Sequence, residues 1–197
     1  MARPRKTKPD EILNRAVDLF WRRGYEDTSY EDLVSATGAS RYALYSDFGE
    51  KQALFHAALD HYNEEVMKHR TADLEQGPEP AQALYDYLRS LAGDLVSDTS
   101  RRGCLVCNTA VDERTIDEGI ARHAKDILDQ VRRRIRRALE RSVHQGLLSP
   151  AVLSDDLDQV ILGYVISMCV LGRTSLSGEL VPAMLRSIEV TIERYKE

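Results

Sequence analysis

Residues 28 to 51, TSYEDLVSATGASRYALYSDFGEK, decide the fold predicted for this chain. Thr28 opens an S/T-x-x-E capping box, which predicts a helix that begins directly after it. This helix is expected to end near Gly38, because glycine enters the left-handed region at low cost and commonly terminates helices. Ser40 is a favoured N-cap for a second helix, over residues 41 to about 47. The stretch therefore predicts two short helices joined by a tight turn.

The second of these helices has one apolar and one polar face. Leu44 and Phe48 lie one turn apart and are expected to be buried. The side chains left on the outer face suit base edges and phosphates. They are Arg41, Tyr42, Tyr45 and Ser46. A helix-turn-helix with such a face predicts a protein that binds DNA.

Further positions match a known family in order and spacing. They are Gly24-Tyr25, Thr28-Ser29, Gly38-Ala39-Ser40, Leu44-Tyr45, Phe48, Lys51 and Leu54. With residues 12 to 24, which look like the family's first helix, the chain resembles the tetracycline-repressor (TetR) family over about residues 10 to 55. The resemblance implies an all-α fold of about nine helices. A DNA-binding helix-turn-helix domain would span residues 1–51, and a ligand-sensing and dimerisation domain residues 52–197.

The distribution of charge agrees with a DNA-binding N-terminus. The 197 residues include 43% hydrophobic and 30% charged residues, as in soluble globular proteins. The net charge is −5, but the first eight residues hold four bases and no acid: Arg3, Arg5, Lys6 and Lys8. Such a basic arm before an acidic body would orient the molecule on DNA. A disordered, solvated tail is the alternative.

No feature predicts export or a membrane span. No apolar core follows the basic residues at the N-terminus, so we expect no signal peptide. The longest apolar run, residues 160 to 171, has 12 residues, whereas a membrane helix needs about 20. We therefore expect a cytoplasmic protein with no membrane partner.

Apolar residues recur at helical spacing along the rest of the chain, and strand signals are nearly absent. The clearest break is the Gly/Pro-rich segment at residues 76–80. The helices expected beyond the motif cover residues 9–24, about 50–69, a stripe at 84–95, 104–113, 116 to about 145, about 155–173 and about 179–196.

A basic cluster marks the long helix that ends near residue 145. It consists of Arg132, Arg133, Arg134, Arg136, Arg137 and Arg141. We favour a solvated face near a helix C-terminus, where the helix dipole attracts cations, over a second DNA contact.

The two C-terminal helices predict a dimer. The helix at about 155–173, which Ser154 would cap, is apolar on nearly every side, so it is expected to be buried on both sides. Together with the helix at about 179–196 it would form a four-helix homodimer interface, as the resemblance also implies. The alternative is a monomer with a deep core. A two-fold dimer would hold two recognition helices about 34–36 Å apart, which predicts a palindromic double-stranded operator.

Individual residues can be given roles on that operator. Arg41 is suited to bidentate hydrogen bonds with guanine, and Tyr42 to a base edge or the sugar-phosphate wall. The resemblance adds Thr28, Tyr45 and Lys51 as phosphate contacts, and the first and last of these lie at helix N-termini, which attract anions. Ser40 and Ser46 complete the expected DNA-binding set. Asp47 departs from the family pattern, in which His is frequent, and its role stays open.

The resemblance also implies that the body binds a small-molecule effector, whose identity the sequence does not give. The candidate pocket residues are Tyr62, Tyr87, Cys104, Cys107, His123, Tyr164 and Met168. Most of them are equally suited to an ordinary core.

The segment RRGCLVCN, residues 101 to 108, resembles a G-C-L-x-x-N segment in one branch of the family, some of whose members respond to electrophiles or oxidants. Cys104 would lie at a helix N-terminus beside Arg101 and Arg102, which lower the pKa of a thiol. Cys107 lies one turn further on and is a possible resolving thiol. The alternative is that both are small buried apolar side chains.

Other chemistry finds little support. Zinc would need a second C-x-x-C pair or clustered histidines, which are absent, so we expect no metal and no cofactor. No Ser/His/Asp or paired-carboxylate arrangement stands out, so no catalytic residue is assigned. Two alternatives to a repressor stay open: a thiol redox enzyme using Cys104 and Cys107, and an interaction module whose helix-turn-helix only packs.

Overall fold

A computed structural model describes residues 8–112, 114 and 117–196. Over these residues the chain is helical, apart from one isolated bridge between Leu148 and Lys196. The described part forms ten helices, nine of them with seven residues or more, when three end-to-end segments count as one rod. This confirms the all-α prediction. Arg3, Arg5 and Lys6 of the basic arm lie outside the described residues.

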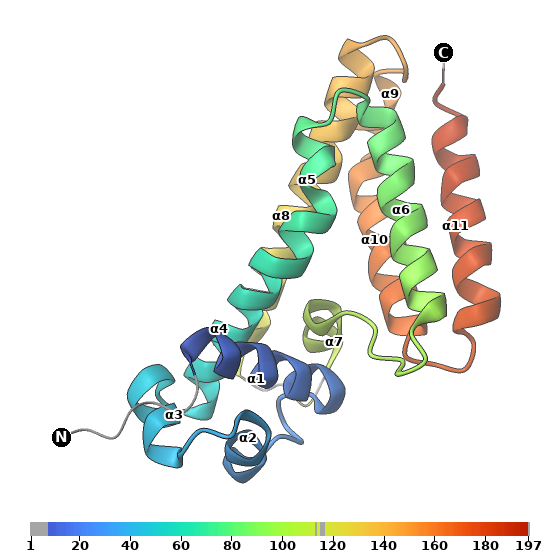
Figure 1. The fold of residues 1–197 in the computed structure, drawn as a ribbon. Coiled ribbons are helices and arrows are strands. Elements are labelled where there is room, and N and C mark those ends of the chain that lie inside the picture. Colours follow the sequence, from blue (N-terminus) through green and yellow to red (C-terminus); the bar gives the residue numbers. More distant parts are fainter. Residues whose placement is uncertain (1–7, 113, 115–116, 197) are drawn as a thin grey trace.

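The N-terminal helices form a small head at one end of the molecule (Figure 1). They are α1 (Pro9–Arg23), α2 (Tyr30–Thr37) and α3 (Arg41–Phe48). The Phe20 ring of α1 meets Phe55 of the next helix edge-on at 4.7 Å between centroids. The core of the head thus continues past residue 51, while the domain boundary itself stays a prediction.

A long rod connects the head to the body. It consists of α4 (Lys51–Tyr62), the π-helical segment η1 (Asn63–Lys68) and α5 (His69–Gln76). The prediction of a helix ending near residue 69 was too short. The segment after it continues to bury Thr71 and Leu74, and the helix ends where Gly77 and Pro78 follow.

The body packs around this rod. Its helices are α6 (Pro80–Ser97), α7 (Leu105–Val111), α8 (Glu118–His144), α9 (Ala151–Ser154), α10 (Leu157–Leu171) and α11 (Ser177–Glu193). The helices α6, α10 and α11 run side by side, and α7 lies between them and the head (Figure 1). The predicted helix ends at Glu113 and Ile116 lie outside the described residues. No helix of the described residues has both the length and the apolar character to cross a membrane.

Two predicted caps were wrong. The capping box of α2 uses Ser29 and Asp32: the Asp32 N–H donates to Ser29 Oγ (3.1 Å) and the Ser29 N–H to Asp32 Oδ2 (3.0 Å). Thr28 lies one residue too early and donates instead to the Gly24 carbonyl (2.7 Å). Ser154 ends α9 rather than capping α10, because the chain reverses at Asp156, whose φ is 51°.

The arginines of α8 are largely bound within the body rather than forming a solvated face. Arg132 and Arg136 pair with the fully buried Asp158 of α10, at 2.9 and 3.3 Å. Arg134 is itself buried and pairs with Glu75 at 3.4 Å. Arg137 also pairs with Glu75, and Arg141 donates to the carbonyls of Glu75 and Gly77. Arg133 is exposed.

Candidate nucleic-acid interface and thiol-lined cavity

The outer face of α3 is open to solvent. Tyr42 is 82% exposed and Tyr45 is 45% exposed, and Arg41 and Ser46 are exposed beside them. Leu44 holds the opposite face in the core with no exposed surface. A helix that served only for packing would not leave this polar, aromatic face uncovered.

Aromatic contacts hold this face in place. The Tyr45 ring stacks on Tyr30 of α2 at 4.4 Å, and the Tyr30 hydroxyl donates to the Gly49 carbonyl (3.0 Å). Arg41 lies 5.3 Å from the Tyr30 ring and pairs with Glu31. Its guanidinium must exchange Glu31 for a new acceptor before it can contact a base. The Ser40 hydroxyl accepts the Ala43 N–H (3.1 Å) and caps α3 as predicted.

The predicted phosphate contacts have different surroundings. Lys51 at the start of α4 donates to the Tyr25 carbonyl (3.0 Å) and lies 4.1 Å from the Tyr25 ring. Thr28 is only 1% exposed, and its hydroxyl is used by Gly24, so its side chain is not presented to a phosphate in this conformation. Asp47 is half-buried, and its role stays open.

A cavity of about 320 Å³ lies within the body, with Trp21 of the head in its wall. Four of the seven predicted pocket residues line it: Tyr62, Tyr87, Cys104 and Cys107. Two ion pairs stand in its wall, Arg70–Asp94 at 2.8 Å and Arg102–Asp98 at 3.6 Å. The lining of the cavity therefore combines apolar side chains with two ion pairs.

The other three predicted pocket residues lie elsewhere. His123 of α8 contacts His56 (2.7 Å) and Asp60 (2.8 Å) at the crossing with α4. The Tyr164 hydroxyl lies 2.9 Å from that of Ser187 on α11. Met168 is fully buried in the core without lining the cavity.

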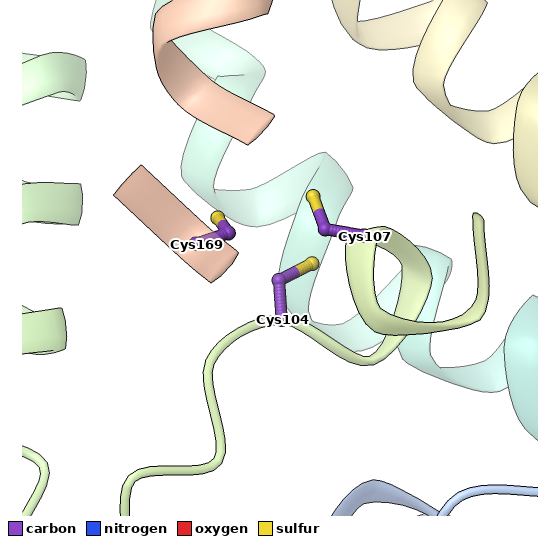
Figure 2. A group of neighbouring side chains, drawn as sticks. All are labelled: Cys104, Cys107 and Cys169. Atoms are coloured by element: carbon purple, nitrogen blue, oxygen red, sulfur yellow. The ribbon is translucent and has the colours of Figure 1, made fainter. Parts of the chain in front are cut away.

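A third thiol joins the two predicted ones. Figure 2 shows Cys169 of α10 directed toward Cys104, which precedes α7, and Cys107, which lies on α7. The three sulfur atoms lie within 4.8 Å of one another, and all three side chains are buried. Cys169 is not among the predicted site residues, because it falls on the same core-facing side of the helix as Ile161 and Val165.

The thiols of the cluster (Cys104, Cys107 and Cys169) are not equivalent. Hydrogen bonds from Cys107 and then Cys169 hold the pKa of Cys104 well below its usual range, against the opposing effect of burial. The pKa values of Cys107 and Cys169 are raised, first by their hydrogen bonds with Cys104. The cause is the neighbouring sulfurs rather than the predicted arginines, since Arg102 instead covers the Trp21 ring at 4.4 Å.

Direct contacts connect this cluster to the head. The Trp21 indole of α1 donates to the Gly103 carbonyl (3.2 Å), next to Cys104 in the chain. Trp21 also meets the Tyr62 ring edge-on at 4.9 Å, and the Tyr62 hydroxyl donates to Cys104 Sγ (3.6 Å). A displacement of Cys104 would therefore be transmitted to Trp21 of α1 in two ways, through Gly103 and through Tyr62.

Comparison with known proteins identifies the family. Residues 12–58 match the model of bacterial regulatory proteins of the tetR family. The HTH-type transcriptional repressor ComR of Escherichia coli K12 is 38% identical over 107 residues, which are 54% of this chain and 51% of ComR. The head of this chain belongs to the TetR family of transcriptional regulators. That assignment removes the thiol-enzyme alternative.

Relatives of known structure extend the likeness over nearly the whole chain. A cysteine-substituted form of the TetR regulator CifR, in complex with 26-bp double-strand operator DNA, is 26% identical with a TM-score of 0.81. The match covers 94% of this chain and 99% of CifR. Reduced NemR of E. coli has the same TM-score at 18% identity, over 92% of this chain and 94% of NemR, and supports the fold alone. By contrast, the match to ComR spans about half of that protein's length.

Proposed function

We propose that this TetR-family chain is a homodimeric transcriptional repressor that reads a palindromic double-stranded operator in the cytoplasm. The observation that supports this proposal most directly is the exposed outer face of α3, with Arg41, Tyr42 and Ser46 uncovered. CifR, a relative over nearly its whole length, was crystallised on operator DNA. In the proposed complex, Ser40, Tyr45 and Lys51 contact the DNA backbone beside these residues. The reading head corresponds to residues 1–51 and the sensing and dimerisation part to residues 52–197.

Dimerisation is proposed through α10 and α11. Their outer faces form an open, largely apolar groove lined by Val160, Gly163, Tyr164, Ser167, Leu180, Ala183, Met184 and Ser187. The opposite face of α10 buries Ile161, Val165 and Met168 in the protein's own core. Helix α10 is thus apolar on two faces, and only one of them is buried in the core of its own chain. A second copy of the chain would cover the other face.

Release of DNA is proposed to start at the cavity. A small molecule held by Tyr62 and Tyr87, or an oxidant or electrophile that modifies Cys104, would alter the contacts of Trp21 and so shift α1. Because α1 belongs to the reading head, a shift there would change the separation of the two recognition helices in the dimer.

Replacing Arg41 with alanine tests the reading head. We expect loss of about 1–3 kcal/mol of sequence discrimination, which is roughly 5- to 150-fold in affinity for the operator over unrelated DNA. Fluorescence anisotropy with a fragment of the upstream intergenic DNA measures this, and size-exclusion chromatography should find the dimer unchanged. Arg133→Ala, an exposed arginine on α8, is the matched control and should bind like the unmodified protein. Unchanged discrimination in the Arg41 variant would refute the assigned head.

The thiols should react unequally. Because the pKa of Cys104 is lowered while those of Cys107 and Cys169 are raised, Cys104 should hold a larger thiolate fraction than the other two at any given pH. A short pulse of iodoacetamide at pH 7, followed by peptide mass spectrometry, should label Cys104 first. Lowering the pH should slow this labelling only once it falls through the lowered pKa of Cys104. Preferential labelling of Cys107 or Cys169 would contradict the assignment of Cys104 as the reactive thiol.

A further inference from the structure

The three sulfur atoms of the thiol cluster converge from two separate parts of the fold. Cys104 and Cys107 come from the start of α7, and Cys169 comes from α10, 62 residues beyond Cys107 in the chain. Their sulfurs lie within 4.8 Å of one another with their side chains buried (Figure 2). Three thiolates spaced evenly around one ion, each at about 2.3 Å, lie at most about 4 Å apart, and closer if the ion stands above their plane. The cluster, with its sulfurs within 4.8 Å, would contract to reach that spacing.

We propose that Cys104, Cys107 and Cys169 form a three-thiolate binding site for trivalent arsenic, supplied as arsenite. Among the described residues, no carboxylate or histidine ligand joins the three sulfurs. Structural zinc takes four ligands and is therefore poorly matched. A soft, thiophilic element that is satisfied by three sulfurs fits the ligand set.

Charge favours trivalent arsenic over other soft ions. Three thiolates with As(III) form a neutral complex, whereas the same thiolates carry a charge of −2 with Cu(I) and −1 with Zn(II) or Hg(II). The sulfurs are buried among Val165, Leu91 and Leu95, where an uncompensated charge is costly. The two cations in the cavity wall, Arg70 and Arg102, are already paired with Asp94 at 2.8 Å and Asp98 at 3.6 Å. The neutral complex is thus the one that this pocket accommodates best.

The binding step is balanced without a redox partner. Arsenous acid, As(OH)3, reacts with three thiols to give As(SR)3 and three water molecules. Three As–O bonds and three S–H bonds break, three As–S bonds and three O–H bonds form, and arsenic stays trivalent. The adjoining cavity of about 320 Å³ admits the reactant and receives the released water.

Binding would also act on the head, a consequence that rests on the proposed function. Drawing Cys104 toward Cys169 moves the adjacent Gly103, whose carbonyl accepts the Trp21 indole N–H. It also removes Cys104 Sγ as the acceptor of the Tyr62 hydroxyl. The first contact is made by Trp21 itself and the second by Tyr62, whose ring packs against Trp21. Because Trp21 belongs to α1 of the head, we expect arsenite to weaken operator binding.

The first test measures binding without DNA. Native mass spectrometry of the reduced protein with sodium arsenite should find one arsenic per chain, and X-ray absorption at the arsenic edge should find three sulfur ligands. Cys104→Ala, Cys107→Ala and Cys169→Ala should each weaken binding by at least about 100-fold, because a tethered third thiolate acts at high effective concentration. Met67→Leu removes another sulfur from the cavity wall and should bind arsenite normally. Circular dichroism checks that each variant is folded.

Several results would overturn the site. Full affinity in Cys169→Ala would mean an ordinary dithiol site on α7 alone. Two sulfur neighbours in the absorption spectrum would mean the same. Displacement of bound arsenite by equimolar Zn(II) or Cu(I) would refute the argument that a neutral complex makes arsenic the preferred ligand.

A second arm separates this inference from the proposed function. Operator binding is measured by anisotropy with and without arsenite, for the unmodified protein and for Cys169→Ala. Release from DNA only in the unmodified protein supports both the site and its coupling. Arsenite binding without any specific DNA binding would retain the site and refute the repressor. Specific DNA binding without arsenite binding would refute the site alone.

Discussion

Replacing Asp158 with alanine is expected to lower the free energy of unfolding by about 3 kcal/mol, because removing one partner of a buried ion pair leaves the other charge uncompensated. The Asp158 carboxylate has no exposed surface and accepts from Arg132 (2.9 Å) and Arg136 (3.3 Å). These two arginines are themselves only about one-third exposed. The change therefore leaves two guanidinium groups at the crossing of α8 and α10 without their shared counter-ion.

Urea unfolding followed by circular dichroism measures this loss, at one fixed protein concentration because the proposed dimer makes stability depend on it. Asp129→Ala is the matched control, since Asp129 pairs with the same Arg132 at 3.7 Å from a position on α8 that is partly open to solvent, unlike Asp158. Ion pairs that are open to solvent contribute about 0–1 kcal/mol, so Asp129→Ala should change the free energy of unfolding only slightly. Equal losses in the two variants would mean that burial of Asp158 does not decide its contribution.

The local parts of the fold could be predicted from the sequence because their signals lie within a few residues. The turn at Gly38, the cap at Ser40 and the break before Pro80 all appear where expected. The cap of α2 was misplaced by one residue because Thr28 and Ser29 both precede an acid at the right spacing. Only the packing of Thr28 against Gly24 distinguishes them.

The long-range parts of the site could not be predicted in the same way. Arg132 and Asp158 are 26 residues apart, and only the crossing of α8 and α10 brings them together. The arginine cluster therefore looked solvated in the sequence. The role of Cys169 is hidden in the sequence for the same reason, because it belongs to an apolar helix whose pattern accounts for it as a core residue. The contact of Trp21 with Gly103, 82 residues away, likewise depends on how α1 packs on the body.

Introducing glutamate at Gly163 is expected to separate the proposed dimer without unfolding the chain. Gly163 lies on the exposed face of α10 within the groove, and a side chain added there would meet no atom within 4 Å in the single chain. Glutamate also favours a helix over glycine by about 0.5–1 kcal/mol, so the monomer should not be weakened. In the dimer the same carboxylate would be buried without a partner, which costs about 3–5 kcal/mol in each protomer.

Sedimentation velocity should therefore find a monomer for Gly163→Glu. Operator affinity should fall by about 100-fold or more, because each head would then bind its half-site without the other. Gly93→Glu is the matched control: Gly93 is exposed in the middle of α6, has equally open space around it and lies outside the groove. It should remain dimeric and bind DNA normally. A Gly163→Glu protein that stays dimeric would place the interface elsewhere. The apolar outer faces of α10 and α11 would then need a different partner.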